Sequence, residues 1–265
     1  MSSAESPGAM NTGPLDWDAE TYDEVSDPQF TWGIEVLERL KLNGDESALD
    51  AGCGSGRVTA ELVKRLPGGR VIAADGSEAM IAKAEERLGD GVSYMVTDLS
   101  ELELEEPVDL IFSTATFHWI LDHDRLFERL HAALRPSGRL VAQCGGQGNV
   151  AEHAEVIATV AARPEFSSHL EQMTGMWNFA APAETEQRLL AAGFSDARCW
   201  LEPKPVTPER PLEFTSTVTL GPLLAQLPEE LCRPFAEAIL EESEKPLTLD
   251  YVRLNIEARA GGIAA

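Results

Sequence analysis

The 265-residue sequence is poor in positively charged residues. It has 21 Lys and Arg residues against 45 Asp and Glu residues, which gives a net charge of −24 at pH 7. Nucleic-acid phosphates and anionic membrane surfaces repel a chain this acidic, so we expect neither of them as a partner. The 43% hydrophobic content is that of a soluble globular protein with one large core or two smaller ones.

Cysteines are few and far apart. The four are Cys53, Cys144, Cys199 and Cys232, with no C-x-x-C pair and no neighbouring histidine. This spacing indicates neither a disulfide framework nor a metal site. It favours a reducing, cytoplasmic location.

Long apolar runs are also missing. Residues 1–14 are rich in Ser, Gly, Ala and Pro but lack a basic start followed by an apolar stretch, so we expect a flexible tail and no signal peptide. No segment approaches the roughly 20 apolar residues that a membrane-spanning helix needs. Nothing in the sequence indicates an oligomeric state.

Short apolar runs alternate with helical patterns between Ser47 and Gln143. Leucine and other apolar residues recur at helical spacing between the runs, and Gly or Pro ends each helical pattern. Such alternation is typical of a parallel sheet flanked by helices. The predicted strands are 47–50, 71–74, 92–96, 108–112 and 139–143, with a turn at Pro136-Ser137-Gly138 before the last.

The remaining chain predicts helices at 151–162 and 184–192 and strands at 197–201 and 249–258. Residues 203–246 hold eight of the sixteen prolines and several short helical patterns, so we expect an inserted helical cap there. Residues 15–202 and 247–265 would then form one Rossmann-like α/β domain, with the cap over its acceptor pocket.

A glycine-rich loop follows the first predicted strand. In Asp50-Ala51-Gly52-Cys53-Gly54-Ser55-Gly56 the alternate glycines expose backbone N–H groups to a ligand at the start of a helix. A dinucleotide fingerprint would need glycine where Arg57 stands, which weakens the alternative of an NAD(P)-dependent oxidoreductase without removing it. Asp50 at the strand end would suit a cationic ammonium group.

Two further acids end the neighbouring strands. Asp75 comes directly after the second strand, where a carboxylate accepts hydrogen bonds from both hydroxyls of a ribose. Asp98 follows the third strand and is expected either to contact an adenine amino group or to cap a short helical segment. Met80 lies on a helix, as a core residue or packed on a base.

These segments resemble, in order and spacing, the class I S-adenosylmethionine-dependent methyltransferases. The resemblance covers about a hundred residues and includes Thr97-Asp98, Val108 to Phe112 and Leu134 to Leu140. It implies a Rossmann-like seven-stranded sheet with helices on both faces, and S-adenosylmethionine as cofactor. By this resemblance Asp50, Gly52, Gly54 and Gly56 hold the methionyl part, Asp75 holds the ribose, Asp98 and Leu99 hold the adenine, Ser113, Thr114 and Ala115 flank the methionine, and Cys53, Gly76 and Met80 lie beside them.

A narrower resemblance concerns the segment Ser113 to Trp119 and Tyr251-Val252-Arg253-Leu254. Both look like the trans-aconitate methyltransferase branch, which also has a helical cap before its last strand. The branch often has Asn where Thr114 stands, so this side chain departs from the pattern. A tricarboxylate acceptor would need cations gathered in the pocket, and this chain offers few.

Methyl transfer from a sulfonium requires alignment of the nucleophile and exclusion of water. A carboxylate acceptor needs only a cation or hydroxyl to orient it, for which Arg253 and Tyr251 are candidates. A hydroxyl, amine or carbon acceptor would also need a base, for which His118 is the candidate, although its aromatic neighbours equally suit a packing role.

Aromatic residues are expected around the acceptor. Tyr22, Trp32, Trp119, Trp177 and Phe179 are the candidates. The aromatic residues near the N-terminus, which include Phe30, are expected both to form a lid over the cofactor and to dock a predicted helix at 31–40 on the sheet. The sequence therefore predicts a methyltransferase acting on a small molecule, with a carboxylate or hydroxyl favoured. A protein that binds the cofactor without catalysis is the other alternative.

Overall fold

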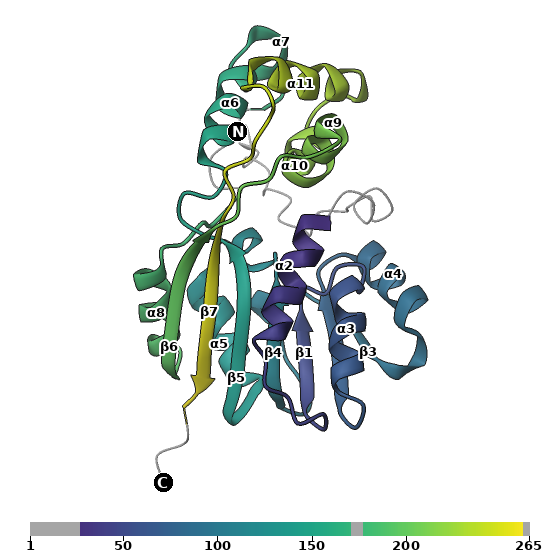
Figure 1. Ribbon diagram of the computed structural model, residues 1–265, viewed down its shortest axis with the longest axis vertical. Helices are drawn as coiled ribbons and strands as arrows, with labels where there is room; N and C mark the ends of the chain where they lie inside the picture. The colour runs from purple at the N-terminus through teal and green to yellow at the C-terminus, as the bar shows by residue number, and fades with distance from the viewer. Residues whose placement is uncertain (1–26, 171–176, 262–265) are drawn as a thin grey trace, which may run out of the picture.

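One seven-stranded sheet forms the centre of the computed structural model, which describes residues 27–170 and 177–261. The strand order is β3-β2-β1-β4-β5-β7-β6 (Figure 1). Neighbouring strands among β1 to β5 are parallel, whereas β7 is antiparallel to both β5 and β6. The strands are β1 (Ser47–Ala51), β2 (Arg70–Asp75), β3 (Ser93–Val96), β4 (Val108–Thr114), β5 (Leu134–Gly145), β6 (Phe194–Pro203) and β7 (Val252–Ala260).

Each of these strands was predicted, and the seven-stranded sheet is confirmed. The largest difference is at β5, which begins at Leu134 and includes the predicted turn Pro136-Ser137-Gly138. The pairing of β4 with β5 shifts register between Val108 and Leu110, and Ser137 has a φ of 66°. The turn residues therefore form an irregularity within a longer strand, because a local bulge does not end the pairing.

Helices cover both faces of the sheet. Helices α2, α3 and α4 pack on one face, and α5 and α8 pack on the other (Figure 1). Alternate residues of β1 enter the two cores, since Ala48 faces the first group and Leu49 the second, as the two-residue period of a strand requires. The bounds are α2 (Asp27–Glu38), α3 (Arg57–Arg65), α4 (Glu78–Leu88), α5 (His123–Ala132) and α8 (Pro182–Ala191).

Side-chain caps fix where two of these helices begin. The Ser77 hydroxyl accepts a hydrogen bond from the Met80 N–H at 3.3 Å at the start of α4, as its sequence predicts. Asp122 does the same for the Arg125 N–H at 2.9 Å at the start of α5. Both caps satisfy N–H groups that no helical carbonyl reaches.

The second body is a layer of short helices above the carboxyl ends of the strands (Figure 1). Its core joins Ile157, Phe166, Leu223 and Phe235, all buried. The sequence interpretation placed only residues 203–246 in this layer, but α6 and α7 also belong to it because their apolar faces pack on the later helices. Its elements are α6 (Ala151–Ala161), α7 (Pro164–Ser167), α9 (Pro211–Phe214), a π-helical turn (Thr215–Thr219), α10 (Gly221–Leu224) and α11 (Glu229–Glu242).

A smaller apolar cluster joins this layer to the sheet domain. It contains Trp32 of α2, Phe214 of α9, and Val150, Leu249 and Tyr251 from the connecting segments. Within the described residues no helix is long and apolar enough to cross a membrane. The same part of the chain contains no group of three His, Cys, Asp or Glu side chains placed to hold a metal ion.

Candidate functional site

The carboxyl ends of β1 and β4 mark the place where the strand order reverses. From β1 the chain proceeds to β2 and β3 on one side, and β4 and β5 lie on the other. Open α/β sheets bind their ligands at such a point, because the loops leaving the two strands diverge and leave a crevice. A cavity of about 70 Å³ is present here.

The glycine loop is held against the neighbouring strand by its backbone. The N–H groups of Gly52 and Cys53 both donate to the Ala74 carbonyl, at 2.8 and 2.9 Å. Gly52 has a φ of 84°, and a Cβ there would overlap Thr116 at 2.1 Å. A Cβ on Gly54, by contrast, would meet nothing within 4 Å, so this part of the loop is open to a ligand.

Asp50 is a nearly completely buried carboxylate beneath this loop. It is 2% exposed, and its Oδ2 accepts a hydrogen bond from the Thr59 hydroxyl at 2.7 Å. Its pKa is raised to about 7, chiefly by burial and also by the nearby Asp75 carboxylate, while the Thr59 hydroxyl opposes the shift. A buried acid with a neutral donor and no ion pair to any described residue is suited to a positively charged ligand group.

Asp75 ends β2 and holds the glycine loop in place. One oxygen accepts from the Gly54 N–H and the other from the Ser77 N–H, both at 2.9 Å. Burial raises its pKa, although hydrogen bonds from Ser77, Gly54 and Gly76 act in the opposite direction. The carboxylate thus lies where its sequence position predicts, and it organises the loop in addition to any contact with a ribose.

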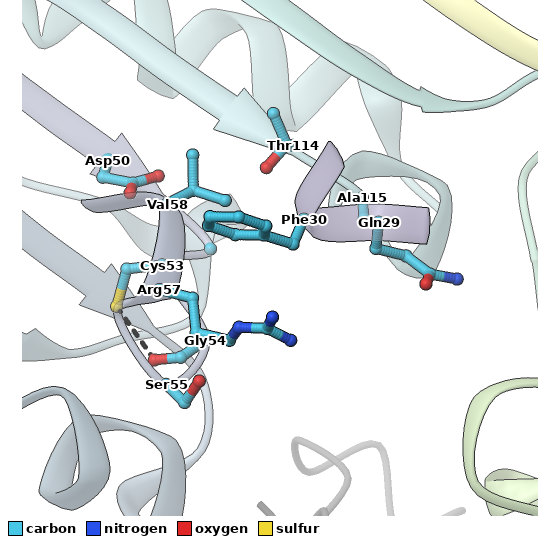
Figure 2. Close-up of a pocket in the computed structure, with 11 residues that line it drawn as sticks. Gln29, Phe30, Asp50, Cys53, Gly54, Ser55, Arg57, Val58, Thr114 and Ala115 are labelled. Atoms are coloured by element: carbon cyan, nitrogen blue, oxygen red, sulfur yellow. Dashed lines mark hydrogen bonds between the residues drawn. The ribbon is translucent and has the colours of Figure 1, made fainter. Parts of the chain in front are cut away.

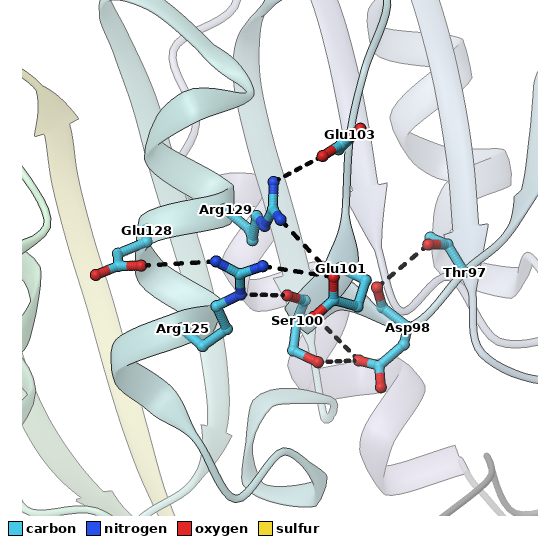
Figure 3. A network of polar contacts seen from close by, with 8 residues as sticks. All are labelled: Thr97, Asp98, Ser100, Glu101, Glu103, Arg125, Glu128 and Arg129. Carbon is cyan, nitrogen blue, oxygen red and sulfur yellow. Dashed lines mark hydrogen bonds and ion pairs between the residues drawn. The ribbon is translucent and has the colours of Figure 1, made fainter.

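Asp98 is exposed and caps the short helical turn Leu99–Glu101. Its Oδ1 accepts from the N–H and from the hydroxyl of Ser100, at 2.8 and 2.7 Å. Figure 3 shows how Ser100 in turn accepts a bond from Arg125 of α5, beside a group of ion pairs between Arg and Glu side chains. The capping alternative therefore describes this side chain, while the side chains of Leu99 and Met80 are buried.

The residues after β4 divide between core and cavity. The Ser113 hydroxyl is 1% exposed and donates to the Ala51 carbonyl at 2.5 Å, so it ties β4 to β1 and lies outside the cavity wall. Thr114 and Ala115 do line the cavity, and Ala115 has a φ of 58°, which turns the chain at its edge.

Helix α2 supplies a wall of the cavity that the candidate residues did not include. Figure 2 shows Phe30 between Val58 and Thr114, with Gln29 beside Ala115. The Arg57 guanidinium lies 4.7 Å from the Phe30 ring centre and pairs with Asp27 at 2.8 Å. The aromatic residues near the N-terminus were the signal for this wall. Tyr22, which the sequence also favours, lies outside the described residues.

A second group of candidate residues lies near the end of β5. The His118 ring is nine-tenths buried and stacks on Phe179, with ring centres 5.8 Å apart. Its Nδ1 accepts the Gly145 N–H at 3.3 Å, so the neutral ring carries its proton on Nε2. Burial lowers the pKa of His118 well below its ordinary value, and the positive charge of Arg253 lowers it further.

The aromatic residues predicted around an acceptor gather here. Trp119 lies 5.1 Å from the His118 ring and 6.0 Å from Trp177, and Trp177 stacks on Phe179 at 5.5 Å. The structure thus brings His118 and three of the five aromatic candidates into one cluster.

Arg253 on β7 is 2% exposed, and its guanidinium lies 5.0 Å from the ring of Trp32. Trp32 in turn meets Tyr251 edge-on, with ring centres 5.2 Å apart. Because Arg253 pairs with Gly145 across β5 and β7, it lies beside the residue that bonds to His118. The three predicted catalytic residues and Trp32 are therefore neighbours at the boundary between the sheet and the helical layer.

Helix α2 connects the two groups, since Gln29 and Phe30 line the cavity and Trp32 packs on Arg253. S-adenosylmethionine, implied by the resemblance, fits the first group. Asp50 is a buried carboxyl group that forms no ion pair with any described residue, and Gly54 leaves open space against the loop. These residues could hold the methionyl end, with Asp75 at the end of the adjacent strand.

Comparisons with known proteins agree with this fit. Residues 48–138 match the family model of a methyltransferase domain. The trans-aconitate 2-methyltransferase of Methylobacterium nodulans is 33% identical over 70% of this chain and 67% of its own length. That of Variovorax paradoxus is 34% identical over 57% of this chain and 58% of its length, and that of Shigella flexneri is 37% identical over 48% and 50%.

Solved structures share the fold. Phosphoethanolamine N-methyltransferase 2 of Haemonchus contortus has a TM-score of 0.60 at 20% identity, covering 92% of this chain and 57% of that chain. A putative sarcosine dimethylglycine methyltransferase of Galdieria sulphuraria has a TM-score of 0.58 at 15% identity, covering 96% and 94%.

These matches favour a methyltransferase over an NAD(P)-dependent oxidoreductase, in agreement with Arg57 at the position where a dinucleotide fingerprint needs glycine. The chain belongs to the class I S-adenosylmethionine-dependent methyltransferases, in the branch of the trans-aconitate 2-methyltransferases, with S-adenosylmethionine as its cofactor.

Proposed function

We propose that this protein methylates a carboxylate oxygen of a small acceptor enclosed between the sheet and the helical layer. The observation that carries the proposal is the burial of Arg253 beside Trp32, Tyr251 and His118. The planar set of N–H donors of a guanidinium matches the two oxygens of a carboxylate. The names of the curated relatives, which specify an acid as acceptor, support the same chemistry.

We assign the cofactor to the crevice at β1 and β4. Asp50 would face the ammonium group, the loop Gly52 to Gly56 with Cys53 would lie along the methionyl chain, and Asp75 would bind the ribose. The backbone of Leu99, with Asp98, Gly76 and Met80, would surround the adenine. When bound, the cofactor supplies a methyl group on a positively charged sulfur, which an oxygen attacks in line.

Arg253 orients the acceptor carboxylate in this proposal. A carboxylate is already ionised at neutral pH, so it needs a fixed position and a dry surrounding more than it needs a base. Trp32 lies on the guanidinium and Tyr251 lies on Trp32, which limits the directions in which Arg253 can point. We expect both aromatic rings to determine the angle of approach.

In this proposal His118 acts as a hydrogen-bond donor to the acceptor and not as a base. Its Nδ1 lone pair is occupied by the Gly145 N–H, and burial with Arg253 nearby keeps the ring neutral. A neutral ring protonated on Nε2 donates a hydrogen bond from that nitrogen and has no free lone pair to accept a proton. The Nε2 proton therefore suits a carboxylate oxygen.

The helical layer would enclose the acceptor and exclude water. Phe214, Val218 and Phe179 give that boundary an apolar lining, and Arg253 is the cation placed within it. This combination favours an acceptor with one carboxylate near the methyl donor and an apolar remainder, so we expect monocarboxylates to be better acceptors than tricarboxylates.

The test is methyl transfer from labelled S-adenosylmethionine to a panel of small acids. Each acid is paired with its primary amide and its alcohol, and trans-aconitate is included because of the relatives' names. We expect methyl esters from acids alone, identified by mass and by release of methanol in alkali. Transfer to the alcohols at equal rate, or to no acceptor, would contradict the proposal.

Variants locate the acceptor in the same assay. Arg253→Met should raise the KM for the acid by about tenfold or more while the Kd of the cofactor stays the same, since a charge-assisted hydrogen bond contributes roughly 1.5–3 kcal/mol. His118→Gln retains a donor and should keep most of the rate. A normal KM in Arg253→Met would place the acceptor elsewhere.

A further inference from the structure

A polar cavity lies on the sheet far from the carboxyl ends of the parallel strands β1 to β5. On the face that carries α2, the described part of the chain places no further helix over β5, β7 and β6 (Figure 1). A cavity of about 220 Å³ opens there between these strands and the end of α2. Its charged lining residues are Arg39, Lys41, Arg139, Asp196, Glu257 and Arg259.

The cations at this cavity lack carboxylate partners in a chain with more than twice as many acids as bases. Arg39, Lys41 and Arg259 form no ion pair with any residue in 27–170 or 177–261, and Arg139 has only Glu46 at 3.8 Å. Burial lowers the pKa of Arg39. The negative charges of Glu257, Glu202 and Glu35 act in the opposite direction, but none of these carboxylates forms an ion pair with Arg39. Because acidic residues outnumber basic ones 45 to 21, a group of basic side chains with so few ion pairs is not expected by chance.

Arg39 is the most constrained member. Its guanidinium lies 5.3 Å from the ring centre of Trp200, and Arg198 lies over the same ring at 5.0 Å. The Arg39 Nε and Nη2 atoms are buried and have no hydrogen-bond partner among the described residues. Stacking on Trp200 fixes the plane of the guanidinium, and a fixed planar set of N–H donors matches the oxygens of an oxyanion.

The sheet itself places two cations opposite each other. Arg139 of β5 and Arg259 of β7 are direct cross-strand partners, so their side chains leave the same face at the same level. Like charges in directly opposed positions destabilise a sheet. An anion between them would convert this repulsion into attraction, which is a second, independent indication of a ligand.

We propose that this cavity binds a compact multivalent oxyanion, either a small polycarboxylate or a phosphate compound, through Arg39, Arg139, Arg259 and Lys41. Two or more anionic oxygens are needed to satisfy donors from α2, β5 and β7 together. Glu257 and Asp196 also line the cavity and would repel a large anion that extends over them. The lining therefore favours a small anion.

The experiment titrates the full chain with citrate and with inorganic pyrophosphate in a calorimeter. Sodium chloride at equal ionic strength serves as the reference, because any salt screens a protein of this charge. We expect one of the two anions, or both, to bind with 1:1 stoichiometry. Binding of citrate alone identifies a polycarboxylate site, and binding of pyrophosphate alone identifies a phosphate site.

Variants assign the binding to this cavity. Arg259→Gln and Lys41→Gln should each weaken it, by about tenfold or more for Arg259, which loses a charge-assisted bond. The matched control is Arg233→Gln, which removes the same charge from the exposed face of α11, where Arg233 pairs with Glu237 at 2.7 Å. This control should bind as the wild type does.

Unfolding temperatures separately measure the repulsion between Arg139 and Arg259, which face each other across β5 and β7. Without added oxyanion, Arg259→Gln should unfold at the same or a higher temperature than the wild type, because it removes a repulsion. Absence of binding beyond the chloride reference, or equal binding by the wild type and Arg259→Gln, would overturn the proposal.

Discussion

At the scale of single residues, the proposed contact between Asp50 and the ammonium group of the cofactor predicts that cofactor binding depends on pH. Burial raises the pKa of Asp50 to about 7, so the carboxyl is largely protonated below that pH when no cation is bound. A cationic ligand requires the carboxylate, and its binding must release the proton. Cofactor affinity should therefore fall as the pH decreases below about 7, by up to about tenfold per pH unit, and should be constant just above it.

Calorimetric titration with S-adenosylmethionine between pH 5.5 and 8.5 measures this dependence. Asp50→Asn should bind more weakly and show no such change across the range, whereas Asp90→Asn, an exposed change between α4 and β3, should behave as the wild type. The stability of the cofactor-free protein has the opposite sign, because a raised carboxyl pKa makes the folded state lose stability as the pH rises from about 4 to 7. A flat affinity profile in the wild type would remove Asp50 from the ammonium site.

Single residues also show what the sequence could predict. Asp50, Asp75 and the glycine loop were placed correctly at neighbouring strand ends because a parallel sheet aligns those ends. The hydrogen bonds of Ser113 and His118 could not be predicted, since they are made with the backbone of Ala51 and Gly145, which are distant in the sequence.

At the scale of elements, α2 covers the cofactor cavity. Phe30 and Gln29 leave a space of about 70 Å³, which is small beside the roughly 300–1,000 Å³ of an ordinary ligand pocket. We therefore expect the first turn of α2 to move when the cofactor enters. The exposed Arg57–Asp27 pair and the Phe30–Arg57 contact hold that turn in place.

Shortening Phe30 should ease this movement. We expect Phe30→Ala to bind S-adenosylmethionine with a faster association rate, measured by stopped-flow fluorescence of the tryptophans. Glu38→Ala, an exposed change at the other end of α2, is the control and should not alter the rate. Equal association rates for Phe30→Ala and the wild type would mean that the cofactor enters without displacing this side chain.

The prediction for α2 itself was too late by four residues at its start. The structure begins the helix at Asp27, with Pro28 in its first turn, whereas the apolar spacing suggested residues 31–40. An acidic residue followed by proline is a helix-start signal that the apolar pattern alone does not contain. The sequence did not predict that α6 and α7 belong to the helical layer, for a different reason. Periodicity predicts a helix but not the surface on which that helix packs.

At the scale of the whole molecule, the net charge of −24 opposes the entry of an anionic acceptor. Repulsion of this kind slows association, and salt weakens it because the Debye length shortens to about 10 Å at 0.1 M. For a carboxylate acceptor, kcat/KM should thus increase, by about twofold or more, when sodium chloride is raised from 10 to 200 mM. The step after binding takes place in a buried site, so kcat should change little.

The cofactor provides an internal control for this effect. S-adenosylmethionine carries a net positive charge, so its association with the acidic protein should slow with added salt while that of the acceptor accelerates. Steady-state rates measured with each reactant varied in turn separate the two trends. If kcat/KM for the acid falls with salt in parallel with that of the cofactor, the local field of Arg253 outweighs the charge of the whole surface, and the acceptor is steered by its site from the beginning of the encounter.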